Sequence, residues 1–120
     1  MLSNNLMDNI NKVIQLTKEY FGENVTCFFV TPEDNELNFA IECLVYRSFL
    51  VRFTLGDVQK GGVFGIDISI GEKMFNLEIL IHEDISIDFT DKDIRDNLKI
   101  LDNYLQWRMT DSQKSTFGIL

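Results

Sequence analysis

The hydrophobic positions of this chain follow a helical period at both ends and a period of two between them. Residues 4–21 predict an amphipathic helix, because apolar side chains recur every three or four residues. Ser3 is suited to cap the start of this helix, and Gly22 is suited to end it. The apolar stripe consists of Leu6, Ile10, Val13, Ile14, Thr17 and Phe21.

Between Val25 and Phe89 the apolar residues alternate with polar ones, as they do in half-buried β-strands. Turn residues divide the region: Pro32 begins one turn, and Gly71-Glu72 matches a two-residue hairpin. The sequence therefore predicts strands over residues 25–31, 36–46, 48–55, 63–70 and 74–82, with a short sixth segment at 85–89.

A second amphipathic helix is predicted to begin after Thr90 and to end near Met109. We expect the last residues, 110–120, to form a flexible tail. Hairpin-length connections favour an antiparallel meander. The prediction is a single α+β domain over residues 1–120, in which a five- or six-stranded antiparallel sheet carries both terminal helices on one face.

Composition narrows the possible partners. Of 120 residues, 45% are hydrophobic, which is enough for one core, and the formal net charge is −8. Such a charge opposes direct binding to nucleic acid or to an anionic membrane, and it favours a basic protein partner. The polar N-terminus and the two cysteines lead us to expect a cytoplasmic, reduced protein.

The residue types that usually carry catalysis or bind metals form no motif here. Alternation places Cys27 and Cys43 on the core face of the strands and the single histidine, His82, on the opposite face. The segment that begins at Gly61-Gly62 matches neither the G-x-G-x-x-G motif nor a P-loop, the two common phosphate-binding loops. The segment that begins at Asp91 does not match an EF-hand loop. We therefore expect no cofactor, no metal and no enzymatic activity.

Acidic residues gather in two places. Between Glu78 and Asp102 there are eight acids and three bases, and an acidic turn precedes the second strand. Either group is a candidate docking surface for a basic partner, although a solvated face is the ordinary alternative. The candidate contact residues are Glu33, Asp34 and Glu36 in the turn, and Glu83, Asp84 and Asp88 in the second cluster.

The outward face of the predicted sheet is unusually apolar. Strand alternation places Phe28, Tyr46 and Leu50 on it, with Arg52 among them. This mixture is typical of interfaces, with a partner protein or in a homodimer. A bulge that reverses the alternation, or a tail that covers the patch, would explain the pattern equally well.

We interpret the chain as an acidic inhibitor of the immunity-protein or antitoxin kind, which neutralises a basic toxin or nuclease by covering its active site. Acidic residues would steer the encounter, and Phe28, Tyr46 and Leu50 would anchor the complex. An inhibitor that mimics nucleic acid is a close variant.

The alternative is a secretion-type chaperone, which the chain resembles in its small size and acidity. The resemblance implies binding of an extended client segment and dimerisation. The chain departs from that class between strands three and four, where residues 56–62 are glycine-rich and such chaperones typically carry a helix.

Overall fold

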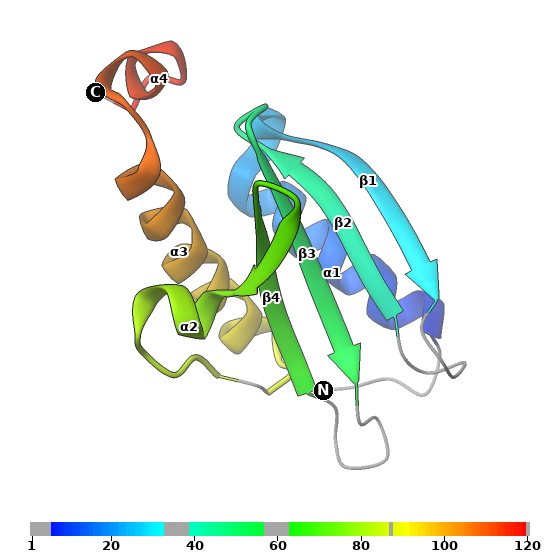
Figure 1. Ribbon diagram of the computed structural model, residues 1–120. Helices are drawn as coiled ribbons and strands as arrows, with labels where there is room; N and C mark the ends of the chain where they lie inside the picture. The colour runs from blue at the N-terminus through cyan, green and yellow to red at the C-terminus, as the bar shows by residue number, and fades with distance from the viewer. Residues whose placement is uncertain (1–5, 33–38, 57–62, 87, 120) are drawn as a thin grey trace.

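A computed structural model describes residues 6–32, 39–56, 63–86 and 88–119. They form an α+β domain with one antiparallel sheet in the strand order β1-β2-β3-β4-β5 (Figure 1). This confirms the predicted class and the meander. The elements are α1 (Leu6–Phe21), the 3-10 turn η1 (Gly22–Asn24), β1 (Val25–Pro32), β2 (Phe39–Val45), β3 (Phe49–Gly56), β4 (Val63–Ile70), β5 (Lys73–Asn76), α2 (Leu77–Ile81), α3 (Asp91–Arg108) and α4 (Asp111–Thr116).

The two long helices, α1 and α3, lie side by side over one face of the sheet (Figure 1). They run in the same direction, because their contacts follow the same order along both helices. Lys12 Nζ, in the middle of α1, lies 2.9 Å from Asp91 Oδ1 at the start of α3. Further along both helices, the Tyr20 hydroxyl donates to Asp102 Oδ2 at 3.2 Å. The prediction that both terminal helices cover the same face is therefore correct.

The core lies between this helical layer and the inner face of the sheet. Three phenylalanine rings continue from the sheet towards α3, with centroid distances of 5.9 Å from Phe53 to Phe64 and 5.9 Å from Phe64 to Phe89. Each large apolar side chain buried here stabilises the fold by about 1.5–3 kcal/mol. The largest fully buried side chains are Phe39, Phe53, Phe64, Ile41, Leu55, Ile66, Ile68, Leu77, Ile94, Leu98, Leu101 and Leu105.

β1 contains a bulge that overturns the predicted faces of its second half. Thr26 pairs with Leu44 and Phe29 pairs with Glu42, so two residues of β1 oppose one residue of β2. Cys27, in the bulge, has a φ of 61° and is exposed. The alternation reverses beyond it.

The turn between β2 and β3 departs from the prediction in a second way. Tyr46 and Arg47 have φ values of 52° and 55°, which place them in the left-handed region. The backbone N–H of Tyr46 donates to the Asn24 carbonyl at 2.7 Å, so the turn is attached to η1. This conformation directs the Tyr46 side chain into the core.

The fifth strand is much shorter than predicted, because the chain becomes helical at Leu77. Asn76 caps this helix, α2, by accepting the backbone N–H of Glu78 at 2.9 Å. Leu77, Leu80 and Ile81 fit a helical face, whereas Leu77 and Ile81 with Ile79 between them fit one face of a strand. The short run therefore does not distinguish the two periods. The predicted strand over residues 74–82 is therefore wrong beyond Asn76.

The segment after α2 also differs from the prediction. Residues 83–86 and 88–90 form no strand, and Asn97 Nδ2 holds this segment against α3 by donating to the Ser86 carbonyl at 2.7 Å. At the C-terminus, α4 is helical and carries a capping box between Thr110 and Gln113, where we had expected a flexible tail. Among the described helices, none has the length and apolarity that crossing a membrane requires.

Candidate protein-binding groove

The predicted anchor residues Phe28 and Tyr46 do not lie on the outer face of the sheet. The bulge in β1 turns Phe28 inward, where it is half-buried and Lys18 Nζ lies 5.4 Å from its ring centroid. Tyr46 is buried between the rings of Phe21 and Phe117, at centroid distances of 5.8 and 5.2 Å. The prediction that both side chains lie on the outer face of the sheet is therefore wrong: Tyr46 is buried, and Phe28 is turned inward and only partly exposed.

Tyr46 instead belongs to a buried polar junction around Asp102. Its hydroxyl donates to Asp102 Oδ1 at 2.7 Å, while the Tyr20 hydroxyl and Gln106 Nε2 donate to Oδ2 at 3.2 and 3.1 Å. Burial, together with the adjacent carboxylate, raises the pKa of Tyr46, and the same causes raise the pKa of Tyr20 to about 12. The junction joins α1, the β2–β3 turn and α3, and its polar groups are occupied within the fold.

The outer face of the sheet carries a row of side chains that crosses all five strands. Register places Phe29, Glu42, Arg52, Asp67 and Asn76 side by side in this order. Phe29, predicted to point inward, is 66% exposed at one end. At the other end of the row, Asn76 Nδ2 donates to Asp67 Oδ1 at 3.4 Å.

Of the other residues predicted for this face, Leu50 lies there and is 37% exposed. Arg52 also lies on it, half-buried between Glu42 and Asp67. The outer face is therefore more polar than predicted.

Half of the predicted acidic surface can be located. Glu83, Asp84 and Asp88 are exposed on the segment that joins α2 to α3. Glu33, Asp34 and Glu36 lie outside the described residues. The acids that follow have structural roles, since Asp91 pairs with Lys12 and Asp93 donates its backbone N–H to Thr90 Oγ1 at 3.1 Å.

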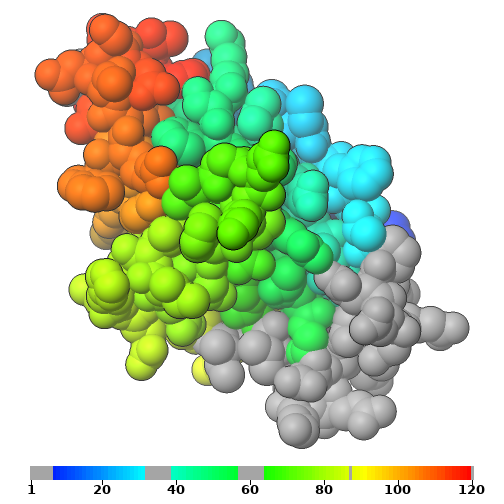
Figure 2. Space-filling model, viewed as in Figure 1, coloured from blue at the N-terminus to red at the C-terminus, as the bar shows by residue number. Residues whose placement is uncertain are grey.

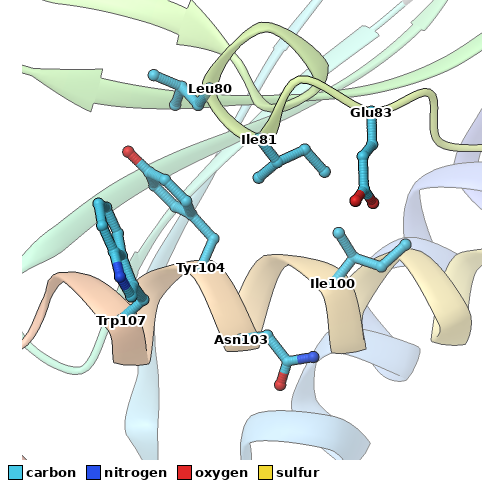
Figure 3. Close-up of a pocket in the computed structure, with 7 residues that line it drawn as sticks. All are labelled: Leu80, Ile81, Glu83, Ile100, Asn103, Tyr104 and Trp107. Atoms are coloured by element: carbon cyan, nitrogen blue, oxygen red, sulfur yellow. The ribbon is translucent and has the colours of Figure 1, made fainter.

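A groove that the sequence did not predict lies beside Glu83, between α2 and α3 (Figure 3). Its volume is about 400 Å³. α2 contributes one wall and α3 the other, and the lining is mainly apolar. The lining residues are Leu80, Ile81, Glu83, Ile100, Asn103, Tyr104 and Trp107.

Trp107 is the most exposed aromatic residue of the described chain. Its side chain is 78% exposed, and its ring centroid lies 6.1 Å from that of Tyr104. Tyr104 is held by Arg108, whose Nη1 donates to the Tyr104 hydroxyl at 3.0 Å. On α2, Ile79 is 67% exposed. Tryptophan at an exposed, apolar position is the residue type most enriched in binding hot spots.

Glu83 supplies the charge of this groove. Figure 3 shows its carboxylate directed towards Ile100, at the end of the groove away from Trp107. None of the ion pairs among the described residues involves Glu83. An apolar lining with one available carboxylate suits a ligand that is apolar and positively charged.

Sequence reasoning missed this groove because it assigned residues 77–81 to a strand. The detectable signals were Asn76 as a helix cap and Trp107 off the apolar stripe of α3. Glu83 and Asp84 were predicted as contact residues and are both exposed, whereas the apolar wall beside Glu83 was not predicted.

The two cysteines are both free thiols, in different surroundings. Cys27 is exposed, contrary to prediction, and Cys43 is buried as predicted, with its pKa raised to about 12 by burial. His82 ends α2 with a φ of 58° and points to solvent. Within the described residues, no three His, Cys, Asp or Glu side chains are grouped to hold a metal ion.

No protein-family model, curated protein or solved structure matches this chain.

Proposed function

We propose that this chain is a small acidic protein-binding module of the immunity-protein or antitoxin kind, which neutralises a basic toxin or nuclease by covering its active site. The observation that carries the proposal is the α2–α3 groove, which is lined by exposed Trp107 and by the available carboxylate of Glu83. The chain continues from Glu83 through the exposed acids Asp84 and Asp88. This combination of an apolar centre and a charged rim is the usual anatomy of a protein interface.

The two parts of this surface have different roles in the proposed mechanism. The net charge of −8 attracts a basic enzyme over roughly 8–10 Å, the Debye length near physiological salt, and it accelerates encounter. The apolar groove then supplies the desolvated contact that slows dissociation. In this mechanism the acids of the α2–α3 segment would take the place of substrate phosphates in the basic active site, which is also the basis of the nucleic-acid-mimic variant.

The experiment that tests this function is affinity capture from the native host at low and at high salt, followed by an enzyme assay on the captured protein. The proposal predicts a single basic enzyme that is released at high salt and loses its activity when the purified chain is added. Capture of an acidic partner, or of a basic enzyme whose activity is unchanged, would contradict it.

A matched pair of variants isolates the acidic surface. The first double variant, Glu83→Lys with Asp84→Lys, changes the proposed surface. The second, Glu23→Lys with Glu72→Lys, is the control, because it changes the net charge equally at exposed positions on η1 and the β4–β5 turn. We expect the first pair to weaken inhibition about tenfold or more beyond the second, because charge reversal juxtaposes like charges across the interface. Equal weakening would show that net charge alone acts.

A secretion-type chaperone remains the second candidate, and one observation favours it. β1 is an edge strand whose exposed side chains include Phe29, which suits the addition of an extended client strand. The bulge at Cys27 interrupts this edge, however, and bulges protect edge strands from pairing. This candidate predicts a dimer and loss of client binding in Phe29→Ser, with no effect of Trp107→Ala.

A further inference from the structure

The α2–α3 groove is charged at one end only. Figure 3 places Glu83 and Trp107 at opposite ends, with Ile81 between them and Ile100 below the Glu83 carboxylate. The lining residues at the Trp107 end, Tyr104 and Trp107, are uncharged aromatic side chains. The Glu83 end therefore carries an available carboxylate, and the opposite end carries no charged lining residue.

This one-sided charge determines the orientation of an occupant. A cationic group gains attraction from the carboxylate at the Glu83 end, and no lining residue offers a carboxylate at the Trp107 end. The apolar stretch between the two ends needs an apolar side chain to fill it. A volume of about 400 Å³ accommodates one or two side chains and not a complete helix.

We infer that the groove binds one short basic and apolar segment of the partner protein, in which a large apolar side chain is followed or preceded closely by Arg or Lys. The apolar side chain lies between Ile81 and Ile100, and the cation pairs with Glu83. The segment continues across the exposed ring of Trp107. This inference rests on the proposed function and names the feature of the basic partner that the chain recognises.

Selection from a library of random short peptides tests the inference without the partner. The immobilised full chain is the target, and the Trp107→Ala variant serves for counter-selection. We expect the enriched peptides to share an Arg or Lys within a few residues of Leu, Ile, Met or Phe. No enrichment, or enriched peptides that lack this pairing, would overturn the inference.

Variants then locate the bound peptide. For a synthetic peptide of the enriched sequence, we expect Trp107→Ala to weaken binding about 30-fold and Glu83→Lys about tenfold. Glu72→Lys, which makes the same charge change on the β4–β5 turn, should alter affinity less than about twofold. Equal binding by all three variants would place the peptide elsewhere and overturn the inference.

The two proposals fail in distinguishable ways. If a captured basic enzyme is inhibited equally by the wild type and by Trp107→Ala, the function stands and the groove is not its recognition site. If the peptides bind as described and no basic enzyme is inhibited, the groove stands and the inhibitor function falls.

Discussion

Two places in this molecule combine aromatic rings with a carboxylate, and they have opposite surroundings. At the buried junction, Asp102 is 8% exposed and accepts hydrogen bonds from Tyr20, Tyr46 and Gln106. In the groove, Trp107 is largely exposed, and Glu83 forms no ion pair within the described chain. The same residue types therefore stabilise the fold in one place and are available for recognition in the other.

The comparison shows that residue type alone does not identify a binding site. Tyr46 and Trp107 are both large aromatic side chains, but only the position of Trp107 leaves its surface to a partner. What distinguishes the two sites is whether the polar and apolar groups are already satisfied within the fold. Variants at the buried junction and in the groove test this difference.

The largest expected effect concerns the buried junction. Asp102→Ala removes the acceptor of three hydrogen bonds and leaves the Tyr46 hydroxyl buried without it. We expect the free energy of unfolding, measured by urea denaturation, to fall by about 3 kcal/mol. Asp96→Ala, which removes one exposed pair with Lys92, should cost less than about 0.5 kcal/mol. Similar losses in the two variants would contradict a structural role for Asp102.

For Trp107→Ala we expect the opposite of Asp102→Ala, namely little change in stability and a large loss of affinity. Because the side chain is 78% exposed, its removal should change the free energy of unfolding by less than about 0.5 kcal/mol. Affinity for the captured basic partner, measured by calorimetry, should fall about 30-fold. A destabilised variant with unchanged affinity would remove the contrast between the two sites.

The junction and the groove also differ in how far they could be predicted. The α+β class, the meander and the two long helices followed from hydrophobic periods in segments long enough to be unambiguous. Glu83 and Asp84 were recognised from charge alone. Tyr46 was misplaced because its left-handed backbone and its attachment to η1 leave no local pattern in the sequence.

The other errors have equally specific causes. The bulge at Cys27 depends on a positive φ at a residue that seldom adopts one, so alternation alone assigned Phe28 and Phe29 to the wrong faces. The run from Leu77 to Ile81 satisfies a strand and a helix equally, and tertiary packing on the sheet decides between them. The groove was unpredictable because it depends on that choice.

A third prediction uses the raised tyrosine pKa values at the junction. Tyr20 ionises at an ordinary value of 10.0 when unfolded and at about 12 when folded, and the pKa of Tyr46 is raised as well. The stabilising effect is therefore complete below pH 10 and is lost as the pH rises from 10 towards 12. Urea denaturation across this range should show falling stability, with a shallower fall in Tyr46→Phe. The same slope in both proteins would contradict this assignment.

The smallest effect is expected on the outer face of the sheet. Phe29→Ser removes its most exposed aromatic side chain, and we expect affinity for the basic partner to change less than about twofold, because the groove lies elsewhere. The comparison with Trp107→Ala separates the two surfaces. A larger loss in Phe29→Ser than in Trp107→Ala would move the binding site to the sheet and favour the chaperone alternative.

The most direct test of the groove uses the single tryptophan of the chain. Incorporation of fluorinated tryptophan gives one fluorine NMR resonance, which reports on Trp107 alone. On addition of the captured basic partner, we predict that this resonance shifts and loses its sensitivity to solvent, because the exposed ring becomes covered. An unchanged, solvent-sensitive resonance in the saturated complex would contradict the central claim that the partner binds at the α2–α3 groove.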